Sequence, residues 1–418
     1  MEDKRNIMLD SFGKLRQYCE KEQFRGWDPY DGLNSKIFQS LPGLKHSPWC
    51  RLAVIQGFKR CPINLRRIAL VPKEYNAKGI GLFLQGYCNL YRVAENRGVE
   101  NDAIQKCIGT KETIQNCIHD LSQLLLSLQS KGDYHGACWG YNFDWQAYGG
   151  LYFPRYTPTV VATNFCATAL MEAYEITKNQ EYLDVALSSA AFVLEDLHRC
   201  PTALNGDTNN PDSEFLFSYS KLPGNDTVYN ASLLGSRLLS YCYKYTKNET
   251  YKTLAEASVK ACCHGQREDG AWVYGMRPTQ NWVDSFHTGY NLDGLIAYEE
   301  NIGDTKYHEY IEKGFAYYMN HFFEADGTPK YYDNQMYPID IHCPGQLLVT
   351  LSRLHQFESY RETAEKVLQW SIDNMQDPKG YFYYQIKKGM SSKISYMRWS
   401  NAFMFNAMSY YLLGNYGR

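Results

Sequence analysis

The feature that most constrains the fold is a repeated unit of two helices joined by a glycine- and aromatic-rich loop. In each unit an apolar-periodic helix precedes the loop, and a second helix with a polar and aromatic start follows it. The loops begin near Gly136, Phe215, Asp269, Asp326 and Lys379. The second helices are expected to begin near Asn76 (the one unit that lacks such a loop), Thr159, Thr227, Asp284, Ile339 and Arg398.

The two helices of a unit differ in their expected exposure. First helices, such as 183–197 and 308–322, carry apolar residues on one face, which is typical of surface helices. Second helices, such as 162–170 and 400–407, are small and apolar nearly all round, which indicates burial. About six such pairs predict an all-α fold, an (α/α)6-type toroid with a double ring of helical hairpins. The loops that enter the inner helices would line a cleft at one end, where helix N-termini favour an anionic ligand.

The chain is expected to form one domain over residues 1–418, because no low-complexity linker divides it. Residues 1–75 are expected to form an N-terminal helical extension packed on the toroid. The segment Trp27-Asp-Pro-Tyr-Asp-Gly is expected to fold over the mouth of the ring, with Arg66 and Arg67 in ion pairs there.

The overall composition limits the classes of binding partner that the chain is expected to have. With 43 basic and 45 acidic residues the net charge is -2, so neither nucleic acid nor membrane insertion is expected. No apolar run approaches the roughly 20 residues that span a bilayer. The 13 scattered cysteines and the polar N-terminus predict reduced thiols and a cytoplasmic location. The 36 tyrosines suit a wet concave surface that holds sugars.

Several long segments carry a family resemblance. They are Gly26-Trp-Asp-Pro-Tyr-Asp-Gly-Leu-Asn-Ser, Pro62-Ile-Asn-Leu-Arg, Gln266-Arg-Glu-Asp-Gly-Ala-Trp-Val-Tyr-Gly, Trp282-Val-Asp-Ser-Phe-His-Thr-Gly-Tyr, Tyr337-Pro-Ile-Asp-Ile-His and Tyr396-Met-Arg-Trp-Ser-Asn-Ala-Phe-Met-Phe. On these the chain resembles, nearly end to end, the VpsJ-type family of bacterial polysaccharide biosynthesis proteins. It is distantly similar to the C-terminal domain of glucuronyl C5-epimerases and to other (α/α) toroid carbohydrate-active enzymes. The resemblance implies a role in the biosynthesis of capsule, exopolysaccharide or O-antigen. It assigns no catalytic residue.

Two polar clusters are candidate catalytic groups. Asp284, His287 and Tyr290 fall at helical spacing and share a face, where Asp284 or His287 could transfer a proton. Alternatively Asp284 caps the helix and His287 bonds a neighbouring loop. Asp340 and His342 form the second cluster, either as an acid/base or hydroxyl-binding pair, or as a helix cap with a buried histidine.

Arg398 is the candidate clamp for a carboxylate or phosphate, because its fork suits bidentate recognition. Alternatively it forms a structural ion pair with an aspartate of a neighbouring unit. Trp139 and Trp145 are expected to stack on sugar rings, unless they pack loop against loop. The complete set of candidate substrate-binding residues is Trp139, Tyr141, Asp144, Trp145, Trp272, Tyr274, Trp282, Tyr332, Gln346, Tyr383, Tyr396, Trp399 and Asn401.

These observations predict an enzyme with an oligo- or polysaccharide substrate. The first hypothesis is removal of the C5 proton of a uronic acid, giving epimerisation or elimination. The second is glycoside hydrolysis by two carboxylates, drawn from Asp144, Asp269, Asp284 and Asp340. The third is a non-catalytic glycan-binding subunit. No cofactor and no metal are expected, although Cys262-Cys-His-Gly is similar to a zinc element of lanthionine cyclases, which are also (α/α) toroids.

Overall fold

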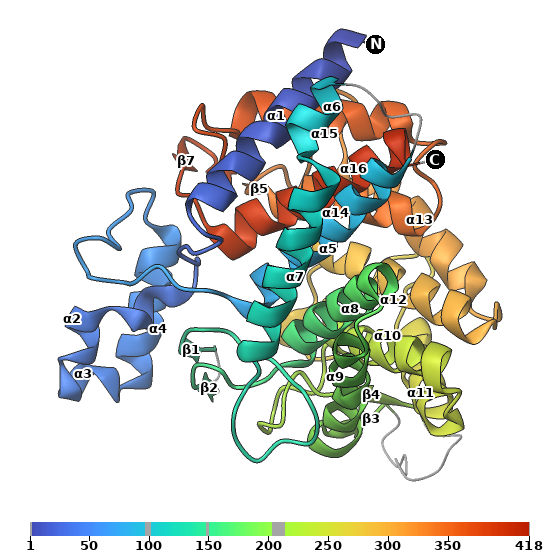
Figure 1. Cartoon of the computed structure of the whole chain (residues 1–418). Coiled ribbons are helices and arrows are strands. Elements are labelled where there is room, and N and C mark those ends of the chain that lie inside the picture. The colour runs from blue at the N-terminus through green and yellow to red at the C-terminus, as the bar shows by residue number, and fades with distance from the viewer. Residues whose placement is uncertain (1, 97–101, 148–149, 203–213, 418) are drawn as a thin grey trace.

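The computed structural model describes residues 2–96, 102–147, 150–202 and 214–417. Its helices lie in two concentric layers (Figure 1). The inner layer contains α5 (Ala77–Glu95), α8 (Val160–Thr177), α10 (Tyr229–Thr246), α12 (Ser285–Ile302), α14 (His342–Arg353) and α16 (Phe403–Tyr416). The outer layer contains α1 (Glu2–Lys21), α7 (Lys111–Ser127), α9 (Gln180–Ala191), α11 (Glu249–His264), α13 (His308–Phe322) and α15 (Arg361–Met375).

The inner layer closes into a ring. Helix α5 packs on α8, α8 on α10, α10 on α12, α12 on α14, α14 on α16, and α16 back on α5. Each inner helix is preceded in the chain by an outer helix, and the inner helices are buried almost all round. The structure therefore confirms the (α/α)6 toroid that the repeat predicts.

Polar caps set where the inner helices begin. The side chains of Asn76, Thr159 and Asp284 each accept a hydrogen bond from the backbone N–H three residues later, as helix caps do. Helix α14 begins after Ile341, and α16 follows a π-helical turn, Met397–Ala402. The predicted starts lie within two residues of the observed ones for α5, α8, α10 and α12, and three residues before that of α14; Arg398 falls in the π-helical turn that leads into α16.

Glycines let the loops approach the neighbouring outer helix closely. Gly270 has φ +93°, and a Cβ there would lie 2.3 Å from the Lys313 carbonyl oxygen of α13. Gly380 repeats this in the last unit, where a Cβ would lie 2.3 Å from the Lys14 carbonyl oxygen of α1. The last loop thus locks against the first outer helix, because only glycine fits at such an approach.

The N-terminal segment contributes to the ring and extends beyond it. Helix α1 lies in the outer layer against α15 and α16, so it is an integral part of the toroid. A 3₁₀ turn (Asp31–Asn34), α2 (Lys36–Gln39), α3 (Pro42–Lys45) and α4 (Pro48–Arg60) then form an arm beside the ring, drawn in blue in Figure 1. As expected, Arg66 is ion-paired here, with a buried Nε to Asp31 Oδ1 distance of 2.6 Å.

The remaining described elements are short. The strands pair as antiparallel hairpins or ribbons: β1 (Trp145–Gln146) with β2 (Tyr152–Phe153), β3 (Arg199–Pro201) with β4 (Phe215–Phe217), and β6 (Gln385–Lys387) with β5 (Ile339–Asp340) and β7 (Met390–Ser392). The short helices are α6 (Asp102–Ile108), a π-helical turn (Phe192–Asp196) and a 3₁₀ turn (Pro278–Gln280). None of the described helices combines the length and apolarity that crossing a membrane requires.

Candidate active site at the mouth of the ring

Aromatic side chains surround the end of the ring where the inner helices begin. Tyr30, from the segment before the arm, has its ring centre 5.8 Å from Trp399 and 6.2 Å from Trp145. Trp145 in turn lies 6.3 Å from Tyr219. We call this set the aromatic rim, and it consists of Tyr30, Tyr141, Phe143, Trp145, Tyr219, Tyr274, Trp282, Tyr331, Tyr332 and Trp399.

The other side of the aromatic rim lies over α12. Tyr274 stacks on Trp282 with ring centres 4.5 Å apart, and Tyr274 lies 4.8 Å from His287. Part of the aromatic rim forms a shallow hollow lined by Tyr141 and Trp145. Burial raises the pKa of Tyr274, so its hydroxyl stays protonated and can donate to a sugar.

An aspartate–histidine pair lies within the aromatic rim. Asp284 Oδ2 is 2.7 Å from His287 Nδ1, and Asp284 also accepts from the Trp282 indole N–H and the His287 backbone N–H. The Asp284 side chain is fully buried, whereas that of His287 is 20% exposed. Within the described chain no residue bonds His287 Nε2. Asp284 therefore serves as helix cap and orients an imidazole whose free nitrogen can exchange a proton with a ligand.

A second buried carboxylate, Asp340, is held by three donors. They are the His342 backbone N–H, the Trp399 indole N–H at 2.9 Å, and the Gln385 amide at 2.6 Å. Burial is the largest influence and raises the pKa of Asp340 to about 6, while these hydrogen bonds act in the opposite direction. Asp340 can therefore hold a proton near neutral pH.

A chain of polar groups crosses the ring axis beneath the aromatic rim. Tyr290 Oη lies 2.7 Å from His342 Nε2 and 3.4 Å from Lys78 Nζ. Lys78 Nζ also lies 4.3 Å from the centre of the Phe165 ring. Burial, followed by the charge of Arg398, lowers the pKa of Lys78, and burial lowers the pKa of His342. All three groups are at most 4% exposed, so Tyr290 and His342, both expected to be catalytic, lie buried beneath the aspartate–histidine pair.

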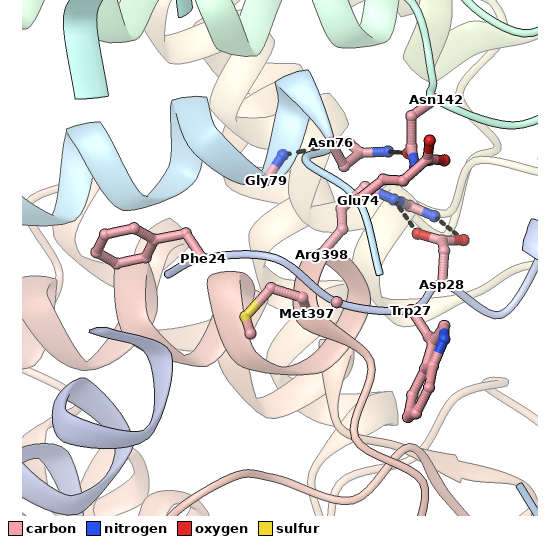
Figure 2. Close-up of a pocket in the computed structure, with 10 residues that line it drawn as sticks. Phe24, Trp27, Asp28, Glu74, Asn76, Gly79, Asn142, Met397 and Arg398 are labelled. Atoms are coloured by element: carbon pink, nitrogen blue, oxygen red, sulfur yellow. Dashed lines mark hydrogen bonds and ion pairs between the residues drawn. The ribbon is translucent and has the colours of Figure 1, made fainter. Parts of the chain in front are cut away.

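Arg398 is engaged by an aspartate from the N-terminal segment, as Figure 2 shows. Its Nε and Nη2 lie 2.6 and 2.8 Å from the two carboxylate oxygens of Asp28, and both side chains are buried. The two side chains line a small pocket together with Glu74 and Asn142. The clamp assigned to Arg398 is wrong, because its bidentate face is already occupied; the ion-pair alternative holds.

Two tryptophans assigned to sugar binding are core residues. Trp139 is completely buried, and its indole N–H donates to the Leu125 carbonyl of α7. Trp272 is 2% exposed and donates to the Cys262 carbonyl of α11. These two predictions are wrong, because each ring packs between its loop and an outer helix and presents no face to a ligand.

Three further predictions in the last unit fail for similar reasons. Tyr396 is buried with its hydroxyl against Arg66, and Asn401 is buried and bonds the Phe382 backbone N–H. Tyr383 bonds Asp377 on the loop after α15, while its neighbour Tyr384 points inward towards Trp399. The chain alternates in direction here, so Tyr383 faces away from the mouth.

Gln346 lies deeper in the ring than a substrate residue would. Its amide donates to Asp293 and to Thr350, and all three side chains are buried. The binding role assigned to Gln346 is therefore wrong, and it belongs to a polar layer inside the toroid.

The four aspartates considered as catalytic carboxylates occupy two kinds of position in the structure. Asp144 accepts from the Arg155 backbone N–H, and Asp269 accepts from the Ala271 N–H and pairs with Arg267, so both stabilise loops. Only Asp284 and Asp340 lie at the mouth beside the aromatic rim. Of the predicted residues, the mouth brings together Tyr141, Trp145, Tyr274, Trp282, Tyr332, Trp399, Asp284, His287 and Asp340.

Several residues of this site were not among the sequence candidates: Phe143, Tyr219 and Tyr331 of the aromatic rim, and also Tyr30, Lys78 and Lys59, whose Nζ lies 2.7 Å from the Tyr30 hydroxyl. Lys78 had a usable signal, because it is a lone cation in the apolar run from Ala77 to Leu84. Tyr30 lies in the loop expected over the mouth, and that placement is observed. Nothing in the local sequence of Lys59 separates it from a surface lysine in the last turn of α4.

Metal binding has no support at the cysteine pair. Cys262 and Cys263 are buried at the end of α11. In the described ranges, no group of three or more His, Cys, Asp or Glu side chains is arranged to hold a metal ion.

Fold and site together define an (α/α)6 toroid with an aromatic-walled mouth that contains a hydrogen-bonded aspartate–histidine pair. Residues 266–417, the part that supplies Asp284, His287 and Asp340, match the sequence profile of Glycosyl Hydrolase Family 88. This match supports an enzyme that acts on carbohydrates. A search of curated protein sequences found no significant match.

Solved structures with the same fold include sugar-processing enzymes. The unsaturated glucuronyl hydrolase from Bacillus sp. GL1 is 10% identical, with 98% of this chain and 96% of that chain covered and a TM-score of 0.58. The cellobiose 2-epimerase from Bacillus thermoamylovorans B4167 is 14% identical, with 81% and 89% covered and a TM-score of 0.57. At these identities the likeness establishes the shared toroid fold.

Proposed function

We propose that this protein is an enzyme that removes the C5 proton of a uronic acid within a glycan, giving epimerisation or β-elimination. The observation that carries the proposal is the Asp284–His287 pair, because His287 is a partly exposed imidazole beside the aromatic rim and its Nδ1 is held by the Asp284 carboxylate. The two buried carboxylates, Asp284 and Asp340, have their oxygens occupied by donors from the protein.

In the proposed reaction the sugar ring lies against the aromatic rim, with C5 facing His287. His287 Nε2 takes the C5 proton, and the electron pair spreads into the uronate carboxylate as an enolate. Asp284 stabilises the resulting imidazolium through Nδ1. A solvent-derived proton added to the opposite face of C5 gives the epimer, and His287 then releases the abstracted proton to solvent. Alternatively the C4–O bond breaks, the substituent leaves as an alcohol after taking up a proton, and an unsaturated uronide remains.

The test is an NMR assay in D₂O with purified protein and hexasaccharides of heparosan, hyaluronan and polygalacturonate. Deuterium at C5, or a new unsaturated uronide, is the expected result, and it should disappear in His287→Gln. A matched control is His308→Gln, because His308 pairs with Glu299 at 3.0 Å on the outer surface of the ring, away from the mouth. Deuterium incorporation that survives in His287→Gln would remove His287 as the base.

A second candidate function is hydrolysis of a glycosidic bond. The match of residues 266–417 to Glycosyl Hydrolase Family 88 favours it. So does Asp340, since a carboxyl group with a pKa of about 6 can act as a proton donor. New reducing ends without deuterium on carbon would support this reaction and contradict proton abstraction. Binding of the hexasaccharides with no product would instead indicate a glycan-binding subunit.

The biological setting is proposed from the family resemblance. The segments shared with VpsJ-type proteins support a role in bacterial surface-polysaccharide assembly, in the cytoplasm. Two observations would test this setting. The modified uronate should be found in the capsular or exopolysaccharide fraction of cells that make the protein. It should be absent from that fraction when the gene is deleted.

A further inference from the structure

A group of basic side chains lies where the arm meets the mouth. Lys59 and Arg60 are the last two residues of α4. Lys59 Nζ is 2.7 Å from the hydroxyl of Tyr30, a member of the aromatic rim. Tyr30 contacts Trp399, whose indole N–H bonds Asp340, so Lys59 lies at the Asp340 side of the mouth.

Lys387 approaches the same place from the opposite direction. In the ribbon of β5 and β6, Gln385 pairs with Asp340 and its side chain donates to the Asp340 carboxylate. Side chains two residues apart on a strand point to the same face, so Lys387 extends from the face that carries Gln385. The arm and β6 therefore supply cations to one spot from two separate parts of the chain.

Within the described ranges these cations form no ion pair, and Asp340 is a carboxylate whose charge acts on Lys59 and Lys387. Across the described residues, no carboxylate lies within ion-pair distance of Lys59, Arg60 or Lys387. Burial, then the charges of Arg60 and Lys59, lowers the pKa of Lys387, so its ammonium group lies close enough to both cations to be repelled by them. By contrast Arg66 and Arg398, on the same side of the ring, are each matched by a buried aspartate.

We propose that Lys59, Arg60 and Lys387 form an anionic subsite that binds the carboxylate of a uronate residue in the glycan. The inference rests on the proposed function and deepens it, since it names a polyanionic glycan as the substrate class. Lys59 keeps two ammonium protons for a ligand after its bond to Tyr30. A bound carboxylate would relieve the repulsion among the three cations and balance their charge.

The position of the cluster fits this role. Asp340, beside it, would repel a carboxylate if these cations were absent, so the subsite needs their excess charge. The substrate's sugar rings would lie on the aromatic rim, with the acidic group directed to the junction of α4 and β6. Cations are also favoured in the last turn of a helix, but that preference explains only Lys59 and Arg60, not Lys387.

The experiment is titration calorimetry of the full chain with the hexasaccharides of heparosan, hyaluronan and polygalacturonate, and with their carboxyl-reduced forms. Lys59→Gln/Lys387→Gln should weaken binding of at least one uronate hexasaccharide by tenfold or more and leave its carboxyl-reduced form unaffected. Raising NaCl from 50 to 300 mM should weaken uronate binding to the wild type more than to the variant. Lys244→Gln, at the opposite end of the ring on α10, should bind as the wild type does.

The outcomes separate the two proposals. Equal binding of both forms of the glycan by wild type and variant would overturn the anionic subsite and leave the proposed enzyme intact. Absence of binding to every saccharide would overturn both. The single variant Lys387→Gln, with thermal unfolding measured alongside, ensures that a folding defect in the double variant is recognised.

Discussion

Asp284 and His287 are joined twice, by the carboxylate on the imidazole Nδ1 at 2.7 Å and by the carboxylate on the His287 backbone N–H at 3.1 Å. The same carboxylate therefore starts helix α12 and fixes the orientation of the candidate base. Structural capping and ring orientation are usually separate functions, and here one residue performs both.

The first prediction concerns this shared role. Asp284→Asn keeps an oxygen for the cap but replaces the anion that stabilises a protonated His287. Turnover should fall about 10²- to 10⁴-fold, the usual contribution of an acid–base group, while the free energy of unfolding changes by about 1 kcal/mol. Steady-state kinetics and urea unfolding of the same preparation check both parts.

The conservative variant Asp284→Glu should recover little turnover, because the longer side chain displaces the carboxylate from Nδ1. Full activity in Asp284→Asn would show that the carboxylate acts only as a helix cap.

The second prediction concerns the buried ion pair of Asp28 and Arg398. Asp28→Asn or Arg398→Met alone leaves an uncompensated buried group and should lower the free energy of unfolding by about 3 to 5 kcal/mol. The double variant should lose less than the sum of the two single variants, because no unpaired charge remains. A double-mutant cycle in urea measures the difference. Additive losses would show that the two side chains do not interact energetically.

The architecture could be predicted from the sequence because its signal is repeated. Helices 308–322 and 285–302 show opposite apolar patterns, one-sided and all-round, and these patterns report burial directly. Helix caps are also local signals, because each cap bonds a backbone N–H only three residues away. The starts of three inner helices could therefore be predicted from their caps, Asn76, Thr159 and Asp284, without knowing how the ring closes.

The functional assignment of single aromatic residues was less predictable, since it depends on which way a loop residue points. Trp139 and Trp145 lie in one loop and have similar sequence surroundings, yet the first bonds a carbonyl of α7 and the second joins the aromatic rim. The partner of Arg398 lies 370 positions away, at Asp28. Such distant contacts leave no local pattern in the sequence.

The third prediction concerns ring closure at Gly380. Gly380→Ala places a Cβ 2.3 Å from the Lys14 carbonyl oxygen, at φ +101°, and should lower the free energy of unfolding by about 3 kcal/mol or more. Gly389→Ala is the matched control, because Gly389 has φ +75° with nothing within 4 Å of an added Cβ. It should cost only the backbone strain, about 1 to 2 kcal/mol. Equal losses in urea unfolding would mean that the contact with α1 adds nothing.

The final prediction concerns the dependence of stability on pH. Asp340 has a pKa of about 6 in the folded protein, raised by burial from the usual 3.8, so the folded state binds this proton more tightly than the unfolded state. Stability should therefore be lost as pH rises from about 4 through 6, by up to about 3 kcal/mol for this group. Asp340→Asn cannot titrate, so the difference in unfolding free energy between wild type and variant should change by that amount between pH 4 and 7. Asp31, whose pKa burial also raises to about 6, contributes equally to both proteins and cancels. Parallel curves of unfolding free energy against pH would show that Asp340 titrates at its ordinary pKa, and its role as a proton donor in hydrolysis would then lose its basis.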